Sequence, residues 1–108
     1  QVRVHLDCAC PPDKLPPDTG DELLAVVKEA LSNALRHSGA ASVEVRVEGD
    51  DERVMVTVAD DGAGFNPARA RRGMGLANMA GRIEASGGSF HLQTAPGKGT
   101  VVTATFPV

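Results

Sequence analysis

The chain has 108 residues and a formal net charge of −3, with 42% apolar and 23% charged residues. This length is close to the commonest domain size and the mixture is ordinary for a globular protein, so we expect one domain spanning residues 1–108. An acidic chain argues against nucleic-acid binding, for which a basic face is expected. No apolar run approaches the roughly 18–20 residues that a membrane-spanning helix needs, so we expect no membrane contact by this domain.

The first residues alternate between apolar and polar, with Val2, Val4 and Leu6 on one face, and predict a strand. A chain that opens on such a pattern without Met indicates a fragment of a longer protein, with any membrane anchor upstream. We expect the fragment itself to be cytoplasmic. Cys8 and Cys10 follow, with one histidine nearby. A structural zinc site needs about four ligands, so we expect these cysteines to be small residues at the strand end; a metal site is the alternative.

Residues 11–20 contain four prolines and predict a loop. Residues 21–37 then predict a helix, which Asp18 or Thr19 can cap and Gly39 can end. The helix is indicated by apolar residues at three- and four-residue steps, namely Leu23, Leu24, Val27, Ala30, Leu31, Ala34 and Leu35.

Residues 42–48 and 53–59 alternate strictly and are separated by a polar turn, which predicts a β-hairpin. Residues 76–86 predict a second helix, which Gly87 and Gly88 stop. Two further strands, 90–94 and 102–106, flank the turn at residues 96–99 and predict a second hairpin. Helices mixed with hairpin-joined strands indicate an α+β fold, a two-layer sandwich of one mixed sheet with helices on one face.

Polar residues form a second stripe on the first helix. Glu29, Asn33 and His37 are spaced by four residues, with Arg36 beside them, so they share one face. Magnesium prefers oxygen ligands and keeps several waters, so the Asn33 oxygen could suffice to hold Mg²⁺ near a phosphate chain. A solvated helix face gives the same pattern, and the stripe alone does not decide between them.

Asp60-Asp61-Gly62-Ala63-Gly64 directly follows a predicted strand. Its glycines allow the backbone to approach a ligand closely, and Asp60 at the strand end can accept a hydrogen bond from an exocyclic amine such as that of adenine. A plain turn has the same composition.

Gly73-Met74-Gly75-Leu76 precedes the second predicted helix. Free N–H groups at a helix start suit phosphate. The segment is neither a P-loop nor a dinucleotide fingerprint, because the lysine, the spacing and the strand context differ.

In order along the chain, these motifs resemble the ATP-binding domain of sensor histidine kinases, in the superfamily that includes gyrase, Hsp90 and MutL. The match comprises an N box at 29–37, a G1 box at 60–64, a G2 box at 73–76 and the segment Gly97-Lys98-Gly99-Thr100. The resemblance covers nearly the whole chain and implies a Bergerat-type ATP-binding fold. It also implies ATP and Mg²⁺ as ligands.

The resemblance implies a role for each matched residue. Asn33 would bind Mg²⁺, Glu29 would orient a water or assist proton movement, and Thr100 would support Asp60 or an adenine-bound water. Asp61 stands where the family more often has Asn and receives no role. The implied ATP-binding residues are Asn33, Arg36, His37, Asp60, Gly62, Gly64, Gly73, Gly75, Leu76 and Thr100.

Residues 29–38 and 75–83 are similar to the sensor kinases that pair with LuxR-type response regulators, and the short lid at 65–72 is typical of them. The implied function is transfer of the γ-phosphate of Mg-ATP to a histidine on a separate dimerisation domain. The first alternative is an anti-sigma-factor-type serine kinase that sequesters a partner, which shares the fold and motifs. The second is an ATPase clamp like gyrase or MutL, which has a longer lid and a further domain.

Overall fold

The computed structural model describes residues 3–9, 17–36, 39, 41–49, 52–63, 76–95 and 97–107. Within these ranges it describes the backbone alone for residues 8–9, 17–19, 33, 36 and 76–78. The elements in chain order are β1 (Arg3–Ala9), α1 (Pro17–Arg36), β2 (Ser42–Gly49), β3 (Arg53–Asp60), α3 (Leu76–Ala85), β4 (Ser89–Thr94) and β5 (Thr100–Pro107). None of these described helices is long and apolar enough to cross a membrane.

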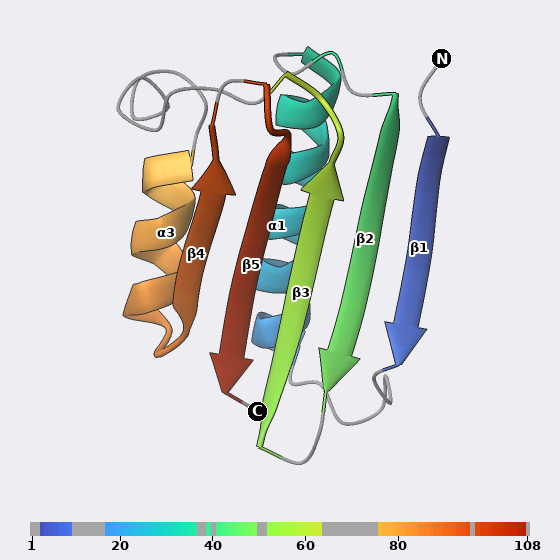
Figure 1. Cartoon of the computed structure of the whole chain (residues 1–108). Coiled ribbons are helices and arrows are strands. Elements are labelled where there is room, and N and C mark those ends of the chain that lie inside the picture. Colours follow the sequence, from blue (N-terminus) through green and yellow to red (C-terminus); the bar gives the residue numbers. More distant parts are fainter. Residues whose placement is uncertain are drawn as a thin grey trace.

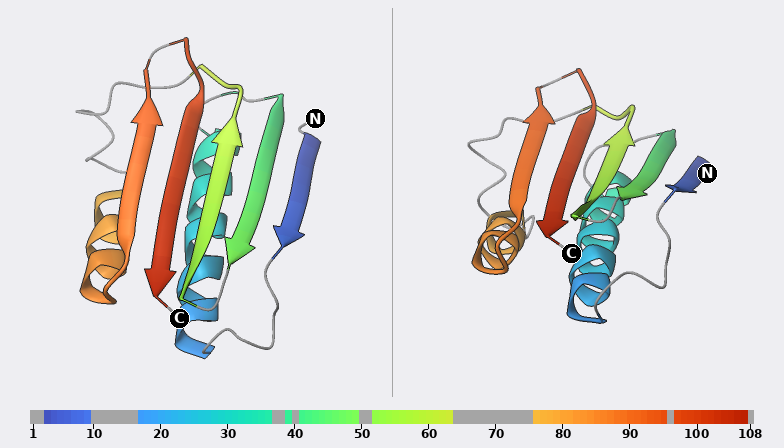
Figure 2. Two further views of the ribbon diagram at one scale, coloured as in Figure 1. Left: turned by 60° about the horizontal axis from the view of Figure 1, so that its bottom comes forward. Right: turned by 90° about the horizontal axis from the view of Figure 1, so that it is seen from below.

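The strands form one sheet in the order β1-β2-β3-β5-β4, and both helices lie on the same face of it (Figures 1 and 2). The second view of Figure 2 shows α1 beneath the middle of the sheet and α3 beneath β4. The expected α+β sandwich, with one mixed sheet and helices on one face, is confirmed.

Both expected hairpins form antiparallel pairs, β2 with β3 and β4 with β5. The long connection through α3 returns the chain so that β5 lies between β3 and β4. The one parallel pair among these strands is that of β1 with β2; β1 adds to the outer side of β2, with Val4 opposite Val43. Local periodicity predicted the strands, whereas this order depends on the long connections.

The core lies between the sheet and the helices. Strict alternation in β2 and β3 turns every second residue, in each case a valine, toward the helices, as predicted, and α1 supplies small and branched side chains against them. α3 contributes Met79 and Ile83, and β5 contributes Phe106. The fully buried side chains of greatest volume are Phe106, Ile83, Val26, Val43, Val54 and Val56.

The expected start of the first helix is wrong. We expected a loop to residue 20, with Asp18 or Thr19 as cap, but α1 already begins at Pro17. Proline is favourable in the first helical turn, where its missing N–H has no helical acceptor and its φ already suits a helix. α1 ends at Arg36, while residues 37 and 38 lie outside the described part of the chain.

Candidate functional site at the end of the central strand

The site begins where β3 ends, at Asp60. The Gly62 backbone N–H donates to Asp60 Oδ1 at 2.9 Å, so the turn after the strand holds one carboxylate oxygen in place. Asp60 is half-buried, and within the described residues its second oxygen, Oδ2, has no hydrogen-bond partner. The strand end therefore presents an oriented acceptor that can take a donor from a ligand.

Thr100 lies beside this carboxylate, because it is the register partner of Asp60 on β5. Its buried hydroxyl is 3.0 Å from Thr94 Oγ1, and the Thr94 hydroxyl also bonds the Gly99 carbonyl at 3.1 Å. The described contact of Thr100 is thus with Thr94, which itself faces the β4–β5 turn.

The β4–β5 turn packs closely against the turn after β3. A Cβ added at Gly99, which has a φ of 73°, would collide with the Asp60 carbonyl oxygen. The Gly97 N–H donates to the Ala63 carbonyl, which ties the two turns together. The predicted G1 segment and the closing Gly-Lys-Gly-Thr segment therefore form one structural unit.

Asp61 connects this unit to β2. Its Oδ1 accepts from the backbone N–H groups of Ala41 and Ser42, each at 2.9 Å, and its own N–H donates to the Ser42 carbonyl at 3.3 Å. The carboxylate thus holds the end of β3 beside the start of β2. Turn composition alone did not predict this role, because the bonded amides lie about twenty residues away along the chain.

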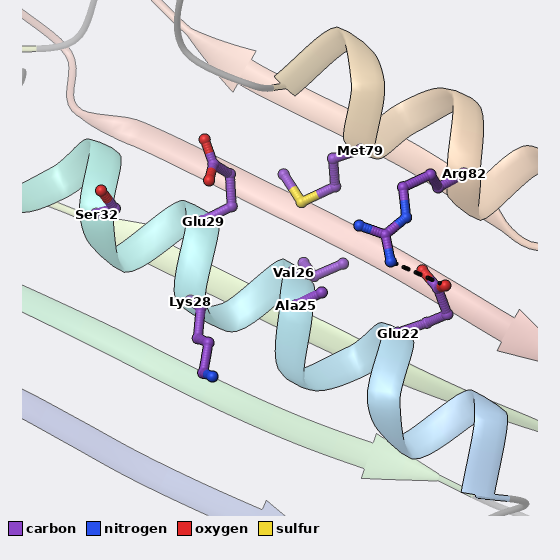
Figure 3. A pocket seen from close by; sticks show the side chains of 8 residues that line it. All are labelled: Glu22, Ala25, Val26, Lys28, Glu29, Ser32, Met79 and Arg82. Atoms are coloured by element: carbon purple, nitrogen blue, oxygen red, sulfur yellow. Dashed lines mark hydrogen bonds and ion pairs between the residues drawn. The ribbon is translucent and has the colours of Figure 1, made fainter.

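A pocket of about 530 Å³ lies between α1 and α3. Figure 3 shows Glu29 of α1 and Met79 of α3 reaching into the space between the two helices, with Ser32 farther along α1. Glu29 is half-buried beside the apolar Met79. An ion pair from Arg82 Nη2 to Glu22 Oε1, at 3.2 Å, bridges the helices in the lower part of the pocket.

The structure thus brings together Asp60, Gly62 and Thr100, and places Glu29 in the pocket between the helices. No described contact joins Glu29 to Asp60. The other predicted positions lie outside the described residues or are described by backbone alone; these are Asn33, Arg36, His37, Gly64, Gly73, Gly75, Leu76 and the lid at 65–72.

The described residues contain no cluster of three His, Cys, Asp or Glu side chains that could hold a metal ion. β1 includes position 8, as expected for a strand end, and Cys10 lies outside the described part. His91, on β4, is exposed. Thr94, whose hydroxyl bonds the Gly99 carbonyl and contacts the Thr100 hydroxyl at the second turn, was not among the predicted site residues.

Comparison with known proteins places this geometry in a family. Residues 18–108 match the sequence profile of the histidine kinase-, DNA gyrase B- and HSP90-like ATPases. The chain belongs to this ATPase family. The matched residues include α1, the turn after β3 and the β4–β5 turn, the parts that build the site.

Curated relatives include the sensor protein VraS of Staphylococcus aureus strain COL, 33% identical over 96 residues that cover 88% of this chain. VraS of Staphylococcus haemolyticus is 32% identical over the same length. The chain spans 28% of the length of these relatives.

Solved structures share the fold. The blue-light activated histidine kinase of Erythrobacter litoralis EL346 matches with a TM-score of 0.81 and 24% identity, covering 98% of this chain and 35% of that protein. The ATP binding domain of PrrB from Mycobacterium tuberculosis matches with a TM-score of 0.71 and 23% identity, covering 98% of this chain and 79% of that one.

Proposed function

We propose that the chain binds Mg-ATP and supplies the γ-phosphate to a histidine on a separate dimerisation domain, in two-component signalling. The observation that carries the proposal is the Asp60 carboxylate, which has one oxygen bonded to Gly62 and the other without a described partner. Membership of the ATPase family supports ATP as the ligand.

The adenine exocyclic amine would donate to Asp60 Oδ2. Gly62 supports this role because its N–H orients the carboxylate and it brings no side chain to the turn. Thr100 would contribute from the neighbouring strand, through the hydroxyl pair with Thr94 or a water beside the base. The sequence pattern of the family further suggests Gly64 for close approach of the backbone.

The phosphates would lie toward the residues matched to the N and G2 boxes. Asn33 would bind Mg²⁺, which would neutralise phosphate charge, because a cation that keeps waters and phosphate oxygens as ligands needs few side-chain oxygens from the protein. The residues proposed to contact phosphate are Arg36, His37, Gly73, Gly75 and Leu76. Phosphoryl transfer then depends on positioning and electrostatic stabilisation.

Glu29 is the proposed catalytic residue. Its half-buried position in the pocket between α1 and α3 supports a role beside the reacting phosphate, where a carboxylate orients a water or takes up a proton. The resemblance to sensor kinases, including relatives named sensor proteins, favours this function over the anti-sigma-type kinase. A LuxR-type response regulator would be the downstream partner, and the domain would act in the cytoplasm.

Isothermal titration calorimetry tests the first step. We expect the chain to bind ATP much more tightly with Mg²⁺ than with a chelator, and Asn33→Ala to remove most of this enhancement because it deletes the metal ligand. Leu35→Ala, on an exposed side chain of α1 that does not line the pocket, is the control and should retain the enhancement. Equal affinity with and without Mg²⁺ in the parent chain would exclude the metal role.

Transfer needs a separate assay. The chain is mixed with γ-labelled ATP and a purified histidine-bearing dimerisation domain from a kinase of the proposed subfamily, and label on the histidine is measured. We expect Glu29→Gln to retain ATP binding and to lose transfer. Transfer unaffected by this substitution would show that Glu29 has no catalytic role.

A further inference from the structure

Within the residues that the structure describes, the outer strand β1 has a neighbour on one side only and leaves the other edge of the sheet open. The helices pack mainly on the other four strands, and Figure 2 shows β1 at the border of the sheet, away from α3. Val4 and Leu6, on the helix side of β1, are 55% and 66% exposed, and the described part of the chain exposes only two other large apolar side chains this far. Exposed apolar residues on a free edge are a template for pairing with another strand.

Alternate residues of β1 direct their backbone hydrogen-bonding groups away from β2. The Arg3 N–H donates to the Ala41 carbonyl at 3.0 Å, so Arg3 turns its backbone groups toward β2. A strand in a parallel pair uses every second residue for its neighbour, so His5 and Asp7 face β2 as well. The backbone N–H and C=O groups of Val4 and Leu6 therefore point away from the sheet.

The opposite face of β1 carries unbalanced charge. Arg46 on β2 pairs with Asp7 at 3.7 Å, with Glu48 at 3.5 Å and with Glu44 at 4.0 Å. Three carboxylates thus surround one guanidinium. Because all four side chains are about half exposed, a second positive group could approach them from the free edge.

We propose that β1 pairs antiparallel with β1 of a second copy of this chain, about a two-fold axis at His5. The strand reads Arg-Val-His-Leu-Asp from residue 3 to residue 7, so this register places Arg3 opposite Asp7 of the second copy, and Val4 opposite its Leu6. The same pairs recur on the other side of the axis, and His5 faces His5 of the second copy. The strand is complementary to itself in charge and in polarity.

The backbone geometry agrees with this register. Val4 and Leu6, whose backbone groups point outward, become the hydrogen-bonded pairs, while Arg3 and Asp7 become the non-hydrogen-bonded pairs, whose side chains approach more closely. In this register, Arg3 of each copy lies beside the carboxylates that surround Arg46 in the other copy. The pocket between α1 and α3 is lined by residues of these two helices, and Asp60 ends the central strand β3. None of these proposed nucleotide-binding residues is on β1, so the pairing leaves them uncovered in both copies.

Sedimentation equilibrium on the 108-residue chain tests the proposal. Because the strand pairing is short, we expect association on the order of 0.1–1 mM, toward a mass twice the 11.2 kDa of one chain. Arg3→Glu and Asp7→Lys should each weaken self-association about tenfold or more, since each places two like-charge pairs across the axis. Arg53→Glu, the same change on an exposed residue of β3, is the matched control and should leave it unchanged.

An equimolar mixture of the Arg3→Glu and Asp7→Lys chains tests whether these two positions face each other across the axis. In the mixed dimer, the introduced glutamate of one chain faces the introduced lysine of the other, and the retained Asp7 of the first chain faces the retained Arg3 of the second. Opposite charges then meet on both sides of the axis, so the mixture should associate about as well as the parent chain. A parent chain that stays monomeric at about 1 mM, a mixture that stays monomeric, or an equal loss in Arg53→Glu overturns the proposal.

Amide hydrogen exchange of the parent chain keeps the test independent of whether the variants fold. The Val4 and Leu6 amides should exchange rapidly in dilute solution and become at least severalfold slower near 1 mM, in the range where small interfaces associate. Exchange of these two amides that does not depend on protein concentration contradicts the pairing.

Discussion

The two oxygens of the Asp60 carboxylate lie in different environments. The Gly62 N–H requires an acceptor at Oδ1, so an Asn at this position should keep its oxygen there and present its NH₂ group outward. The adenine amine and the Asn NH₂ group would then both be donors and could not bond each other, whereas the guanine carbonyl oxygen could accept from the NH₂ group. We expect Asp60→Asn to weaken ATP binding by about 1–3 kcal/mol and to shift the preference toward GTP, as measured by calorimetry with both nucleotides.

Asp61→Asn is the matched control, because it removes the same charge from the neighbouring residue and keeps an oxygen for the Ala41 and Ser42 amides. It should leave the ATP-to-GTP ratio as in the parent chain. If both substitutions changed the ratio equally, the effect would come from the loss of a negative charge, and Asp60 would not recognise the base through a hydrogen bond.

Substitutions at two glycines of the β4–β5 turn can distinguish the cost of a strained backbone conformation from the cost of a steric collision. Gly97 and Gly99 have φ values of 80° and 73°, but only a Cβ at Gly99 meets a neighbour, the Asp60 carbonyl. Gly97→Ala should cost on the order of 1 kcal/mol for its backbone conformation, and Gly99→Ala should cost more and weaken ATP binding by moving Asp60. Urea unfolding and calorimetry measure both; equal effects of the two substitutions would show that the turn yields without moving β3.

At the scale of the elements, α3 is attached to the sheet by apolar packing. Ile83 is 0% and Met79 6% exposed, whereas the ion pair between Glu22 and Arg82 is open to solvent on the arginine side, at 61%. Ile83→Ala should lower the free energy of unfolding by about 2–5 kcal/mol, because it empties a fully buried site.

Arg82→Gln is the comparison, since it removes the ion pair without disturbing the core. An exposed pair contributes about 1 kcal/mol or less, so this substitution should have a small effect. Chemical denaturation of both variants decides the matter. A cost for Arg82→Gln as large as that for Ile83→Ala would mean that the bridge between α1 and α3 holds the helix in place.

At the scale of the whole molecule, strand order should set a gradient of local stability. β3 has hydrogen-bonded neighbours on both sides and lies in the middle of the sheet, while β1 has one neighbour and little helix cover. Amide exchange in dilute solution should therefore be slowest in β3 and β5 and fastest in β1, because central strands open only in larger unfolding events. Protection in β1 equal to that in β3 under these conditions would contradict this gradient.

Local patterns in the sequence determined the elements. Strict alternation predicted β2 and β3, helical spacing predicted α1 and α3, and both expected hairpins form, because these features depend on neighbouring residues. The order of the motifs also identified the family, which the profile match confirmed. The start of α1 was misplaced because a proline-rich segment was interpreted as loop throughout, although proline suits a first helical turn.

Only the tertiary structure decided which distant segments meet. It inserts β5 between β3 and β4, pairs β1 in parallel with β2, and so brings Gly99 against Asp60 and leaves β1 on a free edge. Asp61 likewise contacts backbone amides about twenty residues away. Such contacts depend on how the connections arrange the elements around the common core. Side-chain periodicity and turn composition are local features and do not predict them.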